Sequence, residues 1–394
     1  MSRFRPYWLW AMLTVGQIHH RKEFHMRRAI EVTCAVLVAA WCIATPTVAS
    51  AEGPDPGWAT CSEQTVSVTL SATDPTVYHI VGQLCLVDAA ARGGQTVELA
   101  VSGLTYDHNY FNIPYFPETY SYVYAATDRG YSTFNIDRLG VGLSDRPPAD
   151  QLTVQSHAYT VAQVVRMLRT GVIGGRAFST VVGVGHSLGA GVLQYLAGTG
   201  TDPFGLPNYL ILSGWLHVGH GPALATLGSS LYDARLDRAF ASKKLPAGYL
   251  TTMPDTRGAN FYHQVGAEPA MVIIDEALKQ TGTLTERQTL AAVRASTVTL
   301  GIRIPVLLSV GQYDTLQCNE AAGLSCATSA AIIAREARGY GPRACLRALV
   351  VPGAGHSANM HAAAANSYAE VHDWLDQYTV GGTTAKDANG CLPV

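Results

Sequence analysis

The most constraining feature of this sequence is a lone serine between glycines, where a strand pattern changes into a helix pattern. In FSTVVGVGHSLGAGVLQYLAG, residues 178–198, Ser187 has Gly185 two positions before it and Gly189 two positions after it. So sharp a turn forces the serine into strained backbone angles, and only small neighbours avoid collision. It also places the hydroxyl at a helix N-terminus, where negative charge is stabilised. The pattern predicts a nucleophilic Ser187; the alternative is an inert serine in a glycine-rich connection.

Strand and helix patterns alternate along most of the chain. Long helices between successive strands indicate parallel βαβ units, so we predict a doubly wound, mostly parallel α/β sheet. The expected strands are 65–70, 77–87, 96–103, 131–138, 180–184, 208–214, 304–311 and 346–353. The expected helices are 117–130, 156–170, 188–198, 327–338 and 360–378.

One interval breaks this alternation. Residues 215–303 contain no convincing strand, but helical patterns occur at 232–244 and 286–296. Such an insertion is either a helical cap over the carboxyl ends of the strands or an ordinary run of packing helices. We favour the cap, which divides the core of the fold into residues 52–214 and 304–394.

A serine hydroxyl is a poor nucleophile unless a base accepts its proton, so a histidine held by a carboxylate should follow Ser187. Asp314 and His356 each come just past the end of one of the last two expected strands. The carboxyl ends of parallel strands are where such sheets build their sites. We therefore predict that Ser187, Asp314 and His356 are catalytic. The alternatives are a turn role for Asp314 and a capping or packing role for His356, with His361, inside the expected helix, as a substitute base.

Acyl transfer also needs donors for the negative charge that develops on the carbonyl oxygen. The main-chain N–H of Leu188, directly after the nucleophile, is one expected donor of this oxyanion hole. The second should come from the loop after the strand expected at 96–103, where the N–H of Leu104 is the first candidate and that of Thr105 the second.

The N-terminus has the organisation of a targeting segment. A basic start at 26–28 precedes an apolar run at 32–44 and an A-x-A pattern at 49–51. We interpret residues 1–51 as a signal peptide cleaved after Ala51, which predicts a secreted, extracellular protein without stable membrane insertion after cleavage. The alternative is a membrane anchor, but the run is shorter than the roughly 20 residues that a span needs.

Cysteine content agrees with export. All but two of the eight cysteines lie beyond the targeting segment, and an even number in an exported chain suggests disulfides. We expect neighbours along the chain to pair, namely Cys61 with Cys85, Cys318 with Cys326, and Cys345 with Cys391. No Cys/His spacing suggests zinc, so no metal and no cofactor is expected. The formal net charge of −2 gives no electrostatic reason to expect a nucleic-acid partner.

Taken together, these motifs resemble the α/β-hydrolase superfamily over residues 65–378, and within it capped serine hydrolases of the secreted esterase and lipase kind. The order serine, aspartate, histidine is that of the superfamily. The stretch DRLGVGLSDRP, residues 137–147, is similar to the D-R-x-G-x-G-x-S-x-x-P loop of capped members. In that family the arginine and aspartate fix the turn. The chain departs from the family in having Ser102-Gly103 where members often carry His-Gly.

The resemblance and the predicted triad imply a secreted serine hydrolase that cleaves a carboxylic ester of a small or medium apolar substrate through an acyl-serine intermediate. Aromatic residues gather on both suspected walls of the pocket, and Tyr106, His108 and Trp215 are the expected pocket residues. Acyl transfer, thioester or peptide hydrolysis, or elimination by the same triad stay open as alternatives, as does a non-catalytic binding protein on this fold. The sequence leaves the oligomeric state open.

Overall fold

The computed structural model describes residues 57–381 and 385–393 of the 394-residue chain. The predicted targeting segment, residues 1–51, lies outside the described residues. None of the helices in the described part combines the length and the apolar character that crossing a bilayer requires.

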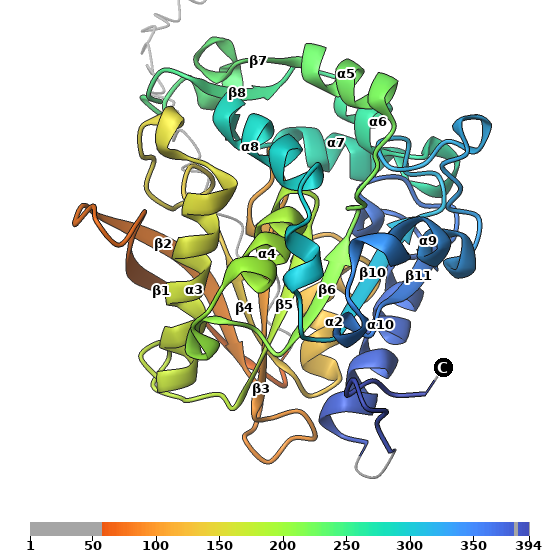
Figure 1. Ribbon diagram of the computed structural model, residues 1–394. Coiled ribbons are helices and arrows are strands. Elements are labelled where there is room, and N and C mark those ends of the chain that lie inside the picture. Colours follow the sequence, from red (N-terminus) through yellow and green to blue (C-terminus); the bar gives the residue numbers. More distant parts are fainter. Residues whose placement is uncertain (1–56, 382–384, 394) are drawn as a thin grey trace, which may run out of the picture. The chain divides into compact units, whose positions relative to one another are not determined.

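An eight-stranded sheet forms the centre of the described part (Figure 1). Its strands are β1 Thr60–Thr69, β2 Val77–Leu86, β3 Thr96–Val101, β4 Ser132–Ile136, β5 Thr180–His186, β6 Tyr209–Ser213, β10 Val306–Gly311 and β11 Arg347–Val351. The spatial order is β1-β2-β4-β3-β5-β6-β10-β11. Strand β2 pairs antiparallel with β1 and β4, and all other neighbours run parallel. The sheet is therefore mostly parallel, as predicted.

Helices cover both faces of this sheet because its central strands are apolar on both sides. In β6, Leu210 and Leu212 contribute to one apolar core, whereas Ile211 contributes to the other. Helices α3 and α4 pack together on the first face, and α2 and α10 pack together on the second (Figure 1). These helices and their neighbours are α1 Pro117–Tyr120, α2 Tyr122–Asp128, α3 Val154–Thr170, α4 Leu188–Thr199, α9 Ser329–Glu336 and α10 Ala364–Thr379.

The single helix expected at 117–130 is in fact two. Ser121 interrupts it with extended backbone angles, φ −91° and ψ 114°. Its side chain accepts a hydrogen bond from the N–H of Tyr124, which caps the start of α2. A serine that bonds to the main chain in this way favours a helix start over a helix interior.

Residues 215–303, called the inserted segment below, lie between β6 and β10 and cover the carboxyl edge of the sheet (Figure 1). The expectation of a purely helical insertion is wrong, because three of its strands form a second, antiparallel sheet in the order β7-β8-β9. Its elements are α5 Gly221–Ser229, β7 Leu231–Asp233, β8 Tyr249–Thr252, α6 Arg257–Phe261, α7 Pro269–Leu278, β9 Gly282–Thr283 and α8 Leu284–Arg294.

The helix expected at 232–244 is also absent. Strand β7 ends there, and two short 3-10 turns follow it. The carboxylates of Asp233 and Asp237 each accept a hydrogen bond from the main-chain N–H two residues later, at 2.9 and 2.8 Å. Aspartates that bond to the local main chain in this way favour turns over a helix.

Three disulfides join the cysteine pairs that the sequence analysis proposed. Cys61–Cys85 links directly opposed residues of β1 and β2. Cys345–Cys391 attaches the C-terminal tail to the chain just before β11. The third bridge closes the loop that follows β10.

Candidate active site

The turn between β5 and α4 holds Ser187 in a strained conformation, with φ +51° and ψ −110°. Both flanking glycines are required by close backbone approaches. A Cβ at Gly189 would lie 2.0 Å from the carbonyl oxygen of Val101, and one at Gly185 would lie 2.7 Å from the nitrogen of Ala190. Gly189 therefore lets the start of α4 lie against the end of β3, and Gly185 lets β5 turn tightly into α4.

The structure brings the three predicted catalytic side chains together. Nε2 of His356 lies 3.0 Å from Oγ of Ser187, and its Nδ1 lies 2.9 Å from Oδ2 of Asp314. His356 and Asp314 are buried. The other oxygen of Asp314 accepts the main-chain N–H groups of Leu316 and Gln317, at 3.0 and 3.2 Å. When Nδ1–H of His356 donates a hydrogen bond to Asp314, Nε2 is left without a proton and can accept a hydrogen bond from the serine hydroxyl.

A second histidine, His186, supports the loop that carries His356. Its ring stacks on Tyr110, with 3.9 Å between ring centroids, and its Nε2 lies 3.2 Å from the carbonyl oxygen of His356. Burial, reinforced by the neighbouring imidazole of His356, holds the pKa of His186 well below its ordinary value. A neutral His186 therefore donates this bond. This supporting role of His186 was not predicted from the sequence, although its position next to Ser187 in the serine motif was a signal for it.

His361, the proposed substitute base, is occupied elsewhere. It precedes α10 instead of lying inside the helix. Its Nε2 accepts the main-chain N–H groups of Gly355 and His263, at 3.0 and 3.1 Å. Burial lowers the pKa of His361 to about 4. The neutral ring of His361 therefore has a structural role, because it holds the main chain at Gly355 and His263 in place.

The loop after β3 is held from behind by a buried guanidinium. Arg138 donates to the carbonyl oxygens of Ser102 and Gly103, at 2.9 and 2.8 Å, and pairs with Glu286 of α8 at 2.6 Å. Carbonyl and N–H point in opposite directions across a trans peptide. Because Arg138 binds the carbonyl of the 103–104 peptide, the N–H of Leu104 points away from it. That N–H has no hydrogen-bond acceptor among the described residues.

Thr105, the second candidate donor, has a different environment. Its φ is +61°, and its carbonyl oxygen accepts the N–H of Gln280 at 3.0 Å. Arg257 of α6 donates to its hydroxyl at 3.0 Å and pairs with Asp275 of α7 at 2.7 Å. The inserted segment thus holds this loop in a strained conformation.

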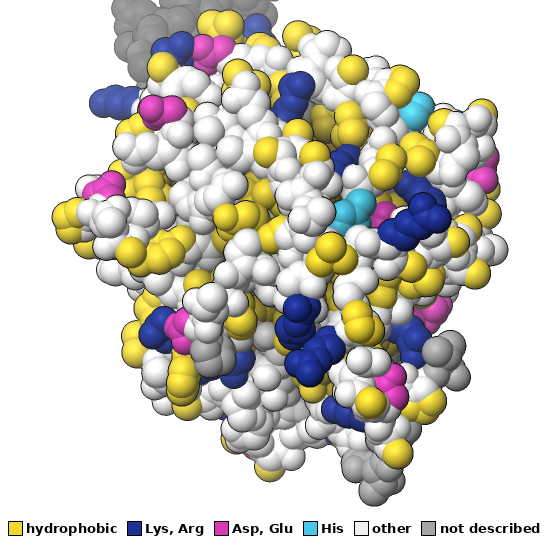
Figure 2. Space-filling view, in the orientation of Figure 1, with side chains coloured by type: hydrophobic (Ala, Val, Ile, Leu, Met, Phe, Trp, Pro, Cys, Tyr) yellow, Lys and Arg dark blue, Asp and Glu magenta, His cyan; other side chains and the backbone are white. Residues whose placement is uncertain are grey.

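A cavity of about 500 Å³ opens at Ser187 and His356. Apolar side chains gather around a hollow in the upper half of the face that Figure 2 shows. Of the expected pocket residues, Trp215 lines the cavity and Tyr106 lines a narrow recess beside Ser187. The full set of lining residues is Leu104, Ser187, Trp215, His217, Val218, Gly219, Leu224, Ala225, Leu227, Arg287, Leu290, Ala291, Arg294, Ala295, Leu316, Gln317 and His356.

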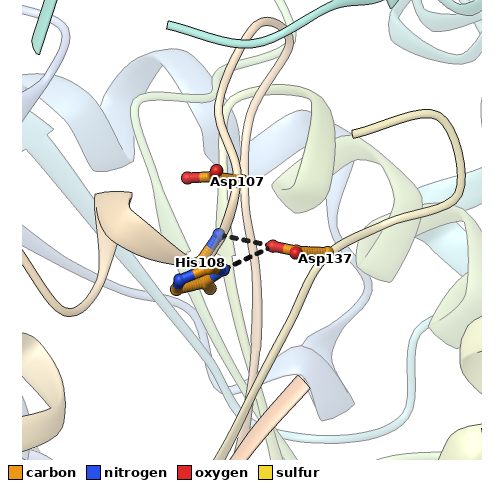
Figure 3. A group of neighbouring side chains, drawn as sticks. All are labelled: Asp107, His108 and Asp137. Atoms are coloured by element: carbon orange, nitrogen blue, oxygen red, sulfur yellow. Dashed lines mark hydrogen bonds and ion pairs between the residues drawn. The ribbon is translucent and has the colours of Figure 1, made fainter. Parts of the chain in front are cut away.

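His108, predicted to line the pocket, lies instead beside Asp137 in the loop after β4 (Figure 3). Oδ1 of Asp137 lies 2.8 Å from Nδ1 of His108 and also accepts the main-chain N–H of that residue, while Oδ2 accepts the N–H of Leu143 at 2.8 Å. With Asp107, these side chains bring potential ligand atoms within 4.8 Å of one another. Both oxygens of Asp137 are already used to hold main chain, which is the turn-fixing role that the family resemblance implied.

Electrostatics bind this cluster together. Burial works against a charged His108, but the charge and hydrogen bond of Asp137, with the nearby Asp107, raise the pKa of His108 to about 9. His108 is therefore an imidazolium at neutral pH, and this cation lowers the pKa of Asp137 despite that residue's burial.

Four polar residues of the cavity wall were missed from the sequence: His217, Arg287, Arg294 and Gln317. The two arginines lie seven residues apart, and so nearly on one face of α8. That spacing was visible in the sequence. The direction in which this face points follows from packing against α4, which the sequence pattern does not contain.

Comparisons with known proteins agree with this fold. The sequence model described as Alpha/beta hydrolase family matches residues 99–367. Among solved structures, an esterase from Thermogutta terrifontis is similar with a TM-score of 0.53 and 18% identity, covering 80% of this chain and 99% of the other. A monoglyceride lipase from Saccharomyces cerevisiae has a TM-score of 0.53 and 16% identity, covering 80% and 97%. A search of curated proteins finds no significant match.

Proposed function

This chain belongs to the alpha/beta hydrolase family, and we propose that it is a secreted serine hydrolase that cleaves carboxylic esters through an acyl-serine intermediate. The observation that carries the proposal is the continuous link from Oγ of Ser187 through His356 to Asp314, at 3.0 and 2.9 Å. Esterases and lipases among the similar structures support ester hydrolysis at the level of the family.

In the proposed reaction, Nε2 of His356 takes the hydroxyl proton while Oγ of Ser187 attacks the ester carbonyl carbon. The tetrahedral intermediate collapses, the alcohol leaves with the proton from His356, and the acyl group stays on the serine. A water molecule, deprotonated by His356, then attacks the acyl carbon, and the carboxylic acid leaves as Ser187 regains its proton. The Asp314 side chain accepts the hydrogen bond from Nδ1 and stabilises the imidazolium that forms in each half of the cycle.

The negative charge on the carbonyl oxygen would be held by the N–H groups of Leu188 and Leu104. Leu188 is the first residue of α4, where helix N–H groups lack partners within the helix. The N–H of Leu104 points away from Arg138, and Leu104 shares the cavity with Ser187. Fixed donors of this kind stabilise the transition state without reorganising, each by about 3 kcal/mol.

The three disulfides support the proposal of export, because such bridges persist in oxidising compartments. The cavity volume, about 500 Å³, is typical of small-molecule sites, which supports a small or medium substrate. Its walls are mostly apolar, which favours an apolar acyl or alcohol chain.

The test is hydrolysis of 4-nitrophenyl esters of graded acyl length by the mature protein and by Ser187→Ala. We expect Ser187→Ala to lose nearly all activity and all labelling by a fluorophosphonate probe. Ser179→Ala is the matched control, because this exposed serine directly precedes β5, whereas Ser187 directly follows it. If Ser187→Ala kept its activity, or if the acyl group passed to an acceptor other than water, the proposed hydrolase would be wrong.

A further inference from the structure

One wall of the cavity carries two cations. Arg287 and Arg294 of α8 both line it, and a separation of seven residues places them about 10 Å apart along one helix face. Among the described residues, none of those that line the cavity is an aspartate or glutamate. The cavity is therefore apolar and positively charged at once.

Arg294 is held in place without a counter-ion. Its guanidinium carbon lies 4.1 Å from the centroid of the Trp215 ring, and Nη2 donates to Oε1 of Gln317 at 3.3 Å. Its Nε is buried and donates to no acceptor among the described residues. Burial lowers the pKa of Arg294 to about 10, so the group stays charged at neutral pH. The structure thus keeps an oriented cation with unused donors at the cavity wall.

The nearest carboxylates do not neutralise Arg294. Asp314 and Glu336 both attract it. Each, however, is bonded to a histidine: Asp314 to His356 at 2.9 Å, and Glu336 to His217 at 2.6 Å. Among the described residues, no carboxylate forms an ion pair with Arg294.

The fully buried cations of the same protein, in contrast, each form an ion pair with a carboxylate. Arg138 pairs with Glu286, Arg257 with Asp275, and Lys279 with Asp237, at 2.6, 2.7 and 2.7 Å. A charge removed from water needs such a partner, because desolvation is costly. Partly buried arginines away from the cavity, such as Arg169 and Arg335, also lack a carboxylate, but they donate to main-chain carbonyl groups instead. Arg294 and Arg287 donate to no main-chain carbonyl among the described residues, which indicates that their partner enters with the ligand.

Arg287 provides a second cation nearer α5. Its guanidinium lies against Gly228, where an added Cβ would come within 2.6 Å of Nη1 and Nη2. It has no ion pair or hydrogen bond among the described residues. Arg287 and Arg294 thus provide two cationic contacts at different positions along the cavity, which ligands of different length can reach.

We propose that the substrate is an ester that carries a second, anionic group, and that Arg294 binds this group as a carboxylate, with Arg287 as a further contact. The inference rests on the proposed hydrolase function and narrows its substrate to monoesters of dicarboxylic acids or esters of hydroxy acids. A planar guanidinium offers two parallel donors to a carboxylate, which fixes orientation as well as charge. The apolar wall between the arginines and Ser187 would hold the connecting chain.

The experiment compares charged and neutral substrates of equal size. In the acyl arm, mono-4-nitrophenyl adipate is compared with the matching primary amide; in the alcohol arm, 6-acetoxyhexanoate is compared with its primary amide. Ser187→Ala gives the blank for spontaneous hydrolysis. We expect kcat/KM to favour the anion by at least about tenfold in one arm, because a charge-assisted pair contributes that much or more.

Variants of Arg294 test whether this residue causes the preference for the anionic ester. Arg294→Gln should remove the preference by raising KM for the anionic ester, with little change for the amide, and Arg294→Lys should keep part of it. Arg303→Gln is the matched control, since this exposed arginine donates to main chain outside the cavity. Calorimetry tests binding separately from catalysis: adipate should bind Ser187→Ala more tightly than it binds the Ser187→Ala/Arg294→Gln double variant. Both proteins should first show a normal unfolding transition.

The outcomes separate this inference from the proposed function. If the wild-type protein cleaves amide and anion equally in both arms, or if Arg294→Gln slows both equally, the anion site is wrong and the hydrolase stands. If neither substrate pair is turned over and a fluorophosphonate does not label Ser187, the hydrolase itself is wrong, whatever adipate binding shows.

Discussion

Gly189→Ala tests the close contact on which the proposed oxyanion hole depends. The new Cβ would lie 2.0 Å from the carbonyl oxygen of Val101 and 2.7 Å from that of Ser102. Both atoms are main chain and have no rotamer by which to move aside. To reach the 3.0 Å below which real Cβ contacts essentially never occur, the start of α4 must move about 1 Å away from the end of β3.

This movement separates the two proposed donors. Leu188 moves with α4, while Leu104 stays with the loop after β3, which Arg138 holds through two carbonyl groups. A misplacement of 1 Å costs on the order of 100-fold in rate. Overpacking also destabilises a fold, typically by about 1–3 kcal/mol. We therefore expect kcat/KM for a 4-nitrophenyl ester to fall about 100-fold in a protein that still folds.

The measurement combines steady-state kinetics with thermal unfolding. Gly221→Ala is the matched control, because an added Cβ there meets nothing within 4 Å, and we expect it to be neutral. Folded Gly189→Ala protein with kcat/KM within a few-fold of the wild type would refute the reasoning. The contact between α4 and β3 would then not position the donors.

Other predictions concern the triad, the loop after β4 and the C-terminal tail. Asp314→Asn should lower kcat by about 10³ to 10⁴, because the amide favours the wrong tautomer of the histidine; unchanged kinetics would contradict the assigned role. His108 has a folded-state pKa of about 9, above its unfolded value of 6.5, so its stabilising contribution, roughly 3 kcal/mol, is complete below pH 6.5 and is lost as pH rises through 9. His108→Gln should flatten this dependence in urea unfolding, and a parallel curve would contradict the pairing with Asp137. Replacing Cys345 and Cys391 by serine opens a loop of 46 residues and should lower the free energy of unfolding by up to about 4 kcal/mol; an unchanged urea midpoint would contradict it.

The parts of the fold that were predictable from sequence have local signals. The strands of the central sheet and the helices beside it have clear hydrophobic patterns in the sequence. The strained turn at Ser187 is indicated by its two flanking glycines. Asp314 and His356 follow strand ends, and the carboxyl ends of parallel strands share one edge of a sheet. That topology explains why residues 42 positions apart or more come within hydrogen-bond distance.

Other parts of the structure could not be predicted from the sequence, because tertiary contacts determine them. Strand β9 has two residues, too few to show any alternation. His108 was assigned to the pocket from its place in the loop after β3, yet its ring turns to Asp137, a carboxylate 29 positions later. The arginines of α8 show helical spacing, but only the packed structure shows that they face a cavity instead of water.

The ion pair between Arg138 and Glu286 has a consequence for how such a protein can change. Arg138 belongs to the core and Glu286 to α8, the helix that also carries Arg294. The segment that we propose to bind the anionic group of the substrate therefore also braces the loop that carries Leu104. Transplanting this segment between relatives as an independent module would separate a buried charge from its partner, so new specificity would have to arise within it or be accompanied by matching changes in the core.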